Sequence, residues 1–329
     1  MIDFSVLVSQ LIQLFCIMGL GYLAFKTKIL NETVNKHMSS FVLQITMPFM
    51  ILDAVLKLDE SAKPSGSIIA VLFIASALFY IIMPIIAFVL VKFLSVTINI
   101  KKHRQGLYMF MLVFANVGFM GFPILQAACG ENGDLAVFYA AILNVFFNLG
   151  SFTYGIIMIG YGTESKAKFS WKKFITPGMF SSFSAIAIYA LGIHYPKEGT
   201  NMLGDVLHGI FSTVGGLTPA LAMILVGSTL ATVKLKEVFN YWRLYVFVGI
   251  KQVILPIIFY PIFRLLIKDD LLSTVLFIEF LMPIANSALI FANQYDLDDK
   301  FTSKAIFIST LFSLVTIPGM LYITSLMPF

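Results

Sequence analysis

The chain of 329 residues is 59% hydrophobic and only 12% charged, and its mean hydropathy is +0.92. Soluble domains carry about 25% charged residues, so this composition excludes a soluble globular domain and predicts a polytopic membrane protein. The net charge is +5, but nothing in the pattern suggests nucleic-acid binding. Cys16 and Cys129 lie in or beside apolar segments and imply no disulfide framework.

Ten apolar segments are long enough to cross a membrane. An α-helix rises 1.5 Å per residue, so a hydrocarbon core about 30 Å thick needs about 20 apolar residues. The segments cover residues 5–25, 38–57, 67–94, 106–129, 134–161, 176–193, 204–232, 241–267, 270–294 and 303–326. The sequence therefore predicts an all-α membrane protein with ten transmembrane helices, of which the sixth is the shortest.

Basic residues indicate the orientation of these segments. With the N-terminus outside, sixteen Lys and Arg residues fall in cytoplasmic loops and five fall outside. The outer five are Lys57, Lys63, Lys197, Arg264 and Lys268. This bias follows the positive-inside rule and predicts that both termini lie outside. Lys251, the remaining basic residue of the 22, lies deep inside a span.

A long basic loop divides the chain into five spans and five spans. We predict a first repeat over residues 1–162, a cytoplasmic linker over 163–175 and a second repeat over 176–329. An odd number of spans in each half makes the second half insert upside down, which is the inverted-repeat plan of many transporters. Short echoes keep their order in the two halves: Met83 to Ile86 resembles Leu255 to Ile258, and Thr46 to Pro48 resembles Thr218 to Pro219.

The fourth span contains residues that disfavour a helix. Its sequence from Phe114 is FANVGFMGFPILQAACG, with Asn116, Gly118, Gly121 and Pro123 inside it. Each Gly weakens a helix by about 1 kcal/mol relative to Ala, and Pro removes a backbone donor. Interrupted helices occur in membranes where the backbone is buried in protein or lines a wet cavity.

The ninth span is interrupted in the same way. Its sequence from Phe280 is FLMPIANSALIFANQY, with Pro283 and Asn286 near its middle. Two interrupted spans in corresponding positions of two halves indicate a substrate site, although a kinked packing helix is the alternative for each one alone.

Two ionisable residues fall deep in the membrane. Lys251 lies about 15 Å into the eighth span, and Glu279 of the ninth span lies at nearly the same level. A charge at mid-bilayer costs about 2.5–3.5 kcal/mol on insertion scales, so such groups pair or line a cavity. Either Lys251 attracts an anion, or Lys251 and Glu279 form a pair that is functional or purely structural.

Other polar residues inside the spans have two readings each. Asp53, five residues after Pro48, is a proton or cation site, or else faces a vestibule or caps a helix. Asn144 and Asn148 share one face of the fifth span and contact either substrate or a neighbouring helix. His208 lies near the outer end of the seventh span, without a second ligand at metal spacing, so we expect no metal and no cofactor.

The two interrupted motifs resemble the fourth and ninth helices of the auxin efflux carrier family, which includes plant auxin transporters and bacterial malate and malonate permeases. The segment FVLQITMPFMIL from Phe41 resembles the second helix of that family. The resemblance spans essentially the whole chain and implies the bile-acid/sodium symporter-like fold, in which helices 4 and 9 unwind and cross at the midplane.

The resemblance also implies residue roles. Asn116 matches the asparagine that contacts the substrate carboxylate, and Asn144 matches a polar position near the same site. The long central loop of the canal-type plant members is missing. Met282 to Ile284 also lacks the polar residue that plant members carry after the ninth-helix proline, which puts an aromatic-acid pocket in doubt.

We therefore expect a plasma-membrane transporter of small organic anions, such as malate or auxin-like acids, that works by an elevator mechanism. The resemblance implies that spans 1, 2, 6 and 7 form a scaffold through which the protein dimerises, and that the other spans move. The candidate binding residues are Asn116, Gly118, Gly121, Pro123, Asn144, Pro283, Asn286 and Lys251, and the coupling or gating candidates are Glu279, Asp53 and Asn148.

Three alternatives remain open. The chain is a sodium-coupled symporter if Glu279 and backbone carbonyls hold the ion. It is an intramembrane enzyme if Glu279, Lys251 or His208 acts in catalysis, although no nucleophile–base pair has a recognisable spacing. The third alternative is a membrane sensor, although the sequence contains no extramembrane signalling domain that could transmit a signal.

Overall fold

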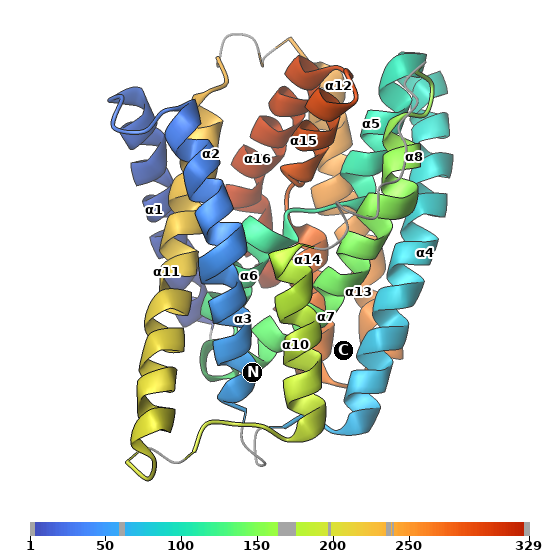
Figure 1. The fold of residues 1–329 in the computed structure, drawn as a ribbon. Coiled ribbons are helices and arrows are strands. Elements are labelled where there is room, and N and C mark those ends of the chain that lie inside the picture. Colours follow the sequence, from blue (N-terminus) through green and yellow to red (C-terminus); the bar gives the residue numbers. More distant parts are fainter. Residues whose placement is uncertain are drawn as a thin grey trace. The chain divides into compact units, whose positions relative to one another are not determined.

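The computed structural model describes residues 4–58, 63–163, 176–196, 199–234, 238 and 240–325. Regular structure in these residues is helical, apart from one isolated antiparallel bridge between Ala115 and Ile284. The chain forms two compact units. Figure 1 labels their helices. Unit 1 comprises Met1–Phe73, Gly118–Val145 and Ile175–Thr232; unit 2 comprises Ile74–Val117, Phe146–Phe174 and Val233–Phe329. Of the predicted linker, only Thr163 belongs to the described residues.

Unit 1 contains the first, second, sixth and seventh predicted spans. Its helices are α1 (Phe4–Lys26), α2 (Glu32–Phe41), the π-helix η1 (Val42–Thr46), α3 (Met47–Leu56), α10 (Pro177–Leu191) and α11 (Met202–Ala231). It also contains α6 (Phe122–Ala128), the 3-10 turn η3 (Gly130–Asn132) and most of the π-helix η2 (Val117–Gly121). Unit 1 therefore contains the four spans that were expected to form a scaffold. It also contains the second half of the fourth span.

Unit 2 contains the third, eighth, ninth and tenth predicted spans. Its helices are α5 (Lys102–Val113), η4 (Ser151–Gly155), α8 (Ile156–Ile159), α12 (Trp242–Gly249), η6 (Ile250–Ile254), α13 (Leu255–Leu266), α14 (Asp270–Leu281), α15 (Ser287–Gln294) and α16 (Asp299–Ser325). Most of α4 (Gly66–Thr97) also belongs to unit 2, and α7 (Gly133–Gly150) is divided between the units. The expected partition therefore differs from the structure at the fourth and fifth spans.

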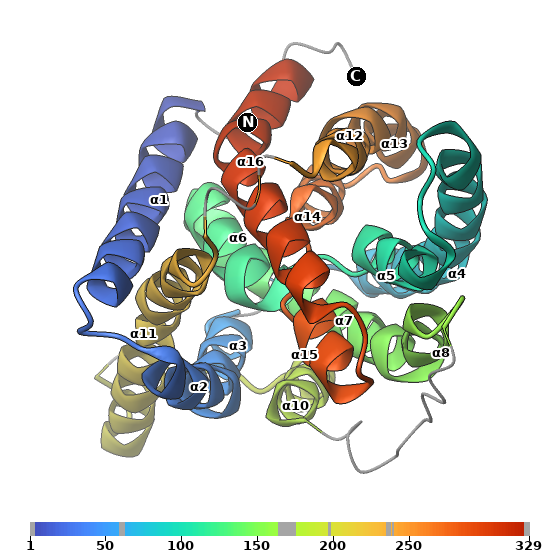
Figure 2. The same ribbon diagram turned by 90° about the horizontal axis from the view of Figure 1, so that it is seen from above.

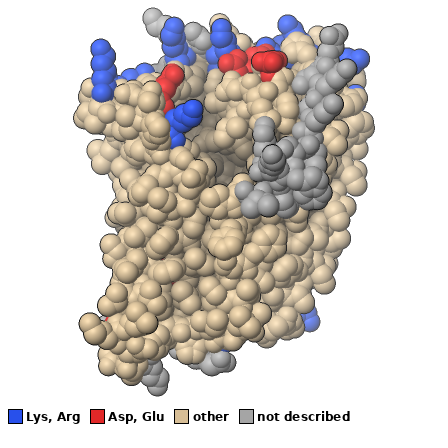
Figure 3. Space-filling model, viewed as in Figure 1, with Lys and Arg blue, Asp and Glu red and all other residues tan. Residues whose placement is uncertain are grey.

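Seven helices in the described part of the chain are long and apolar enough to cross a membrane, and all seven coincide with predicted spans. Of the other three, α10 has 15 residues, about 22 Å of helix, and the fourth and ninth spans are interrupted. The face drawn in Figure 3 carries its charged side chains near the ends, and a broad uncharged band lies between them. These features define a polytopic membrane protein; the inverted-repeat relation stays a prediction.

Three π-helices precede a proline. Pro48, Pro123 and Pro256 each occupy one of the first two positions of α3, α6 and α13, directly after η1, η2 and η6. Proline has no N–H and clashes with the carbonyl one turn earlier, so a widened π turn before it accommodates the lost bond. The sequence predicted continuous spans over 38–57 and 241–267, and the chain does continue as a helix through η1 and η6; the π geometry of these turns was not predicted.

In unit 1, glycines let α1 and α11 pack closely (Figure 2). A Cβ atom at Gly227 of α11 would lie 1.8 Å from the carbonyl oxygen of Met18, and one at Gly21 of α1 would lie 2.1 Å from that of Ile224. Small residues at such contacts let helix backbones approach inside a membrane, where van der Waals packing replaces the hydrophobic driving force.

Candidate functional site

The fourth span is interrupted immediately before the predicted glycines. Helix α5 ends at Val113, and Phe114 takes an extended conformation, with φ −99° and ψ 104°. Helical geometry resumes at Val117 in η2 and continues through α6. Gly118 and Gly121 therefore lie in the π turn, and Pro123 is the second residue of α6.

The ninth span is interrupted at its proline. Helix α14 ends at Leu281, and Met282 is extended, with ψ 144°. This follows from the sequence, because the ring of Pro283 disfavours the α conformation in the residue before it. Helix α15 then begins at Ser287, with Asn286 at the cap position and no hydrogen bond from its side chain to the backbone of the first turn.

The two interruptions meet in unit 2. The backbone N–H of Asn116 donates to the carbonyl oxygen of Pro283 at 2.7 Å, and that of Ala285 donates to Phe114 at 3.2 Å. The bridge between Ala115 and Ile284 lies between these bonds. Extended backbone that lost its helical bonds is thus paired inside the protein, as a membrane requires. Asn116 and Pro283 are in direct main-chain contact.

Neighbouring side chains support this crossing. The N–H of Ile284 donates to the hydroxyl of Ser309 on α16 at 3.1 Å, so a third backbone group is satisfied. The ring of Phe114 packs against Phe110, Phe147 and Tyr80, with centroid distances of 4.5, 5.5 and 6.2 Å. Aromatic rings therefore pack around Phe114 beside the crossing.

The other predicted binding residues are distributed between the units. Asn116 and Asn148 are buried in unit 2, whereas Asn144, Gly121 and Pro123 are buried in unit 1, where Gly118 is half-buried. A Cβ atom at Gly118 would meet only the Met47 methyl at 3.6 Å, an ordinary contact, so packing alone does not require glycine there. Roles for these residues toward substrate stay predictions.

Lys251 and Glu279 do not form the pair that their equal depth suggested. Both are buried in unit 2, with 1% and 6% of their surface exposed. Within the described residues, neither the Nζ atom of Lys251 nor either carboxylate oxygen of Glu279 has a hydrogen-bond partner. Equal depth along two helices does not determine which way the side chains point, and here the two groups do not meet.

Lys251 is linked to the crossing through its neighbour. It lies in η6, and π turns of this kind occur frequently at functional sites. The side-chain amide of Gln252 donates to the carbonyl oxygen of Ser309 at 3.0 Å, and the Ser309 hydroxyl is the acceptor for Ile284. One residue of α16 thus connects the η6 turn with the crossing.

Asp53 is paired within unit 1. Its carboxylate lies 2.7 Å from the Nζ atom of Lys57, one turn later, and accepts a hydrogen bond from the Tyr195 hydroxyl at 3.1 Å. Asp134 completes the group at 4.0 Å from Lys57. Burial and the charge of Asp53 raise the pKa of Tyr195. The i,i+4 spacing of Asp53 and Lys57 favours this ion pair. We did not predict the pair from the sequence because we considered Asp53 alone.

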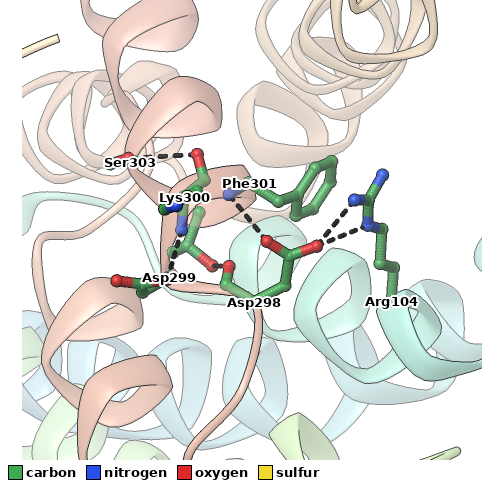
Figure 4. Close-up of polar contacts among 7 residues, drawn as sticks. Arg104, Asp298, Asp299, Lys300, Phe301 and Ser303 are labelled. Carbon is green, nitrogen blue, oxygen red and sulfur yellow. Dashed lines mark hydrogen bonds and ion pairs between the residues drawn. The ribbon is translucent and has the colours of Figure 1, made fainter.

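A polar cluster at the start of α5 has no counterpart among the predicted residues. Arg104 donates to the Asp298 carboxylate, with Nε at 2.9 Å and Nη2 at 2.6 Å, and its guanidinium lies 4.5 Å from the centroid of the Phe301 ring (Figure 4). Asp298 also accepts from the backbone N–H of Phe301 at 3.0 Å, which caps α16. The partners are 194 residues apart in the sequence, so no local pattern reveals them.

An open cavity of about 1140 Å³ lies beside this cluster. It is lined by Lys102, His103, Tyr161, Gly162, Thr163, Gln294, Tyr295, Asp296, Leu297 and Asp298. All of these belong to unit 2 and lie at the ends of α5, α8 and α15 that are far from the crossing. Within the described residues, no three His, Cys, Asp or Glu side chains are grouped to hold a metal ion.

Apolar helices in a membrane, two of them interrupted and joined by main-chain bonds where they cross, are the architecture of a transporter. Comparison with known proteins agrees. The chain belongs to the membrane transport protein family, whose model matches residues 6–321, and it is a membrane transporter of that family. This match confirms the resemblance to auxin efflux carriers.

Two archaeal relatives span nearly the full chain. An uncharacterized transporter of Methanocaldococcus jannaschii is 25% identical over 300 residues, which are 90% of this chain and 92% of the relative. An uncharacterized transporter of Methanothermobacter thermautotrophicus is 23% identical over 309 residues, covering 91% and 92%. Membership in a transporter family also supports the expectation that the chain is not an enzyme.

Proposed function

We propose that the protein is a secondary transporter of small organic anions, carboxylates such as malate or auxin-like acids. The observation that carries this proposal is the main-chain crossing of Phe114–Asn116 with Pro283–Ala285 in a membrane transporter. Interrupting two spans at one place costs helical backbone hydrogen bonds, and a purely structural helix requires no such interruption. Interrupted helices of this kind form the substrate sites of transporters.

The chemistry around the crossing favours an anion. Helix α15 begins at Ser287, just after the crossing, so its N-terminal end brings a partial positive charge there. Asn116 brings an amide donor on the other strand of the crossing, and Lys251 brings a full positive charge when it is protonated. Asn116, Pro283, Asn286 and Lys251, all in unit 2, form the proposed site. Contact of substrate with Gly118, Gly121, Pro123 and Asn144 stays a prediction from the sequence.

We propose elevator-type alternating access in the plasma membrane, with both termini outside. The hydrogen bonds of the crossing all lie in unit 2, which supports movement of the crossing as one body. Unit 1 is the proposed scaffold and dimerisation element. The long row of exposed apolar side chains on α11, from Met202 to Leu217, supports a role in contact with lipid or a second subunit.

The experiment is counterflow of labelled malate in proteoliposomes that contain the purified protein. We expect saturable exchange in the wild type and its loss in Asn116→Ala. Asn132→Ala is the matched control, because Asn132 is exposed in η3 and belongs to no proposed site. Normal exchange in a well-folded Asn116→Ala variant would show that the site is misassigned.

Sodium coupling is the second candidate. The buried carboxylate of Glu279, with both oxygens unpaired in the described structure, is the feature that favours it. The counterflow assay run in sodium-free buffer distinguishes the two, since a rate that is independent of sodium removes the symporter.

A further inference from the structure

Lys251 is held in an unusual environment for a lysine in a membrane protein. The η6 turn packs against α12, α13, α14 and α16, and these helices leave only 1% of Lys251 exposed. Its Nζ atom has no hydrogen-bond partner among the described residues. The adjacent Gln252 donates to α16 through Ser309 at 3.0 Å, so the turn that carries Lys251 is anchored at the residue that supports the crossing.

The titratable and charged groups on the helices around Lys251 are Arg243, Tyr245, Tyr260, Arg264, Asp270, Glu279, Asp299, Lys300, Lys304 and Tyr322. Most lie near helix ends, and Arg264 and Asp270 are paired with each other. The Tyr260 hydroxyl donates to Thr324, and Glu279 is buried with both oxygens unpaired. In the described structure none of these groups pairs with Lys251.

An ammonium group in these surroundings is unfavourable because burial removes its water and nothing replaces it. Either loss of the proton or a bound counter-charge removes this cost. A carboxylate that enters the site changes this balance, because an opposite charge at short range favours the protonated amine. Anion binding and protonation of Lys251 then strengthen each other, and the linkage is reciprocal.

We propose that Lys251 makes transport proton-coupled, taking up one proton when an organic anion binds and releasing it when the anion leaves. The proposal rests on the proposed function and adds the coupling ion to it. On one side of the membrane, a proton from water forms the fourth bond of the Nζ atom as the carboxylate arrives. On the other side, the anion departs, that N–H bond breaks and the proton returns to water. The empty carrier resets with a neutral amine.

The test counts protons in the purified full-length protein. Malate is added to the protein in weakly buffered detergent solution at several pH values near neutral, and proton uptake is followed with a pH indicator while bound malate is measured with label. We expect the wild type to take up protons in proportion to bound malate, approaching one for each anion as the pH rises. The control variant Lys300→Arg changes an exposed lysine at the start of α16 and should behave like the wild type.

Two variants make the assignment specific. Lys251→Arg carries a permanent charge because arginine does not lose its proton in proteins, so malate that binds this variant should bring no proton with it. Lys251→Met carries no charge, so it should bind malate more weakly and also without proton uptake. In proteoliposomes, an inside-alkaline pH step should drive malate accumulation in the wild type in the direction expected for symport, and not in either variant.

The outcomes distinguish the proposal for Lys251 from the proposal of anion transport on which it rests. Malate binding without proton uptake in the wild type overturns the role of Lys251 and leaves anion transport standing. Proton uptake that persists in Lys251→Arg also overturns it, since another group must then be the acceptor. Absence of binding of malate and of a panel of other mono- and dicarboxylates in a folded protein contradicts the proposed function itself, and the proposal for Lys251 fails with it. The wild-type proton count does not depend on any variant folding.

Discussion

At the scale of single residues, the chain places its buried charges in two different ways. Asp53 has Lys57 at 2.7 Å and the Tyr195 hydroxyl at 3.1 Å, so its charge is balanced inside unit 1. Lys251 and Glu279 have no such partners in the described part of unit 2. Paired buried charges fix structure, and unpaired ones are costly unless a ligand or a proton completes them. Asp53 thus has structural partners, and the lack of partners around Lys251 in the described residues supports the role proposed for it.

The Asp53 group gives a prediction about stability. Lys57→Met leaves a buried carboxylate without its cation and should destabilise the protein by about 1–3 kcal/mol. Adding Asp53→Asn to that variant should recover part of the loss, because the unpaired charge is then gone. Thermal unfolding in detergent measures both, with Glu131→Gln, an exposed carboxylate of η3, as the control. Strictly additive effects of the two substitutions would contradict the pairing.

At the scale of elements, the interrupted spans are held in two places. Main-chain bonds join them at the crossing, and the Arg104–Asp298 ion pair joins the start of α5 to the turn between α15 and α16. The side chains of this pair are 23% and 25% exposed, so solvent screens it less than a fully exposed pair. Because α5 and α15 are the two half-helices that leave the crossing toward this end, the pair positions them relative to each other.

Charge reversal tests this second contact. Arg104→Asp and Asp298→Arg should each reduce transport severalfold, and the double exchange should restore part of it, because the attraction returns with the signs reversed. The Asp298 cap of α16 and the Phe301 stacking are not restored, so recovery should be incomplete. Counterflow rates per folded transporter provide the comparison. A double variant no better than the worse single variant would mean that the ion pair itself does not matter.

Helix packing in unit 1 gives a prediction with an internal control. Gly227→Leu inserts a side chain where a Cβ atom would already lie 1.8 Å from the Met18 carbonyl oxygen, so α1 and α11 must separate. Gly216→Leu changes the same helix at a position where nothing lies within 4 Å. We expect the first to abolish a monodisperse peak in size-exclusion chromatography and the second to leave it unchanged. Equal behaviour of the two would contradict the close packing.

At the scale of the whole molecule, helical segments were predictable and contacts between distant segments were not. Pro283 determined an extended Met282 through local sterics, and the composition determined the spans. The pairing of Asn116 with Pro283 joins residues 167 positions apart, and only the folded chain brings them together. The expected Lys251–Glu279 pair failed for the same reason, because sequence gives depth along a helix but not the direction of a side chain.

The packing of α5 and α6 also explains why the fourth span is divided between unit 1 and unit 2. After the extended backbone at Phe114–Asn116, α6 packs with α1 and α11 in unit 1, to which most of η2 also belongs, while α5 stays in unit 2. The fourth span is therefore divided between the two units close to the break at Phe114–Asn116.

The central claim is that the crossing binds an organic anion, and direct binding tests it most simply. Labelled malate is titrated onto immobilised wild type, Asn116→Ala and Asn132→Ala in a scintillation proximity assay, with unlabelled mono- and dicarboxylates as competitors. A hydrogen bond to a charged group contributes about 1.5–3 kcal/mol, so we predict that Asn116→Ala weakens binding by roughly 10- to 100-fold while the control does not. Equal affinities in all three proteins would contradict an anion site at the crossing.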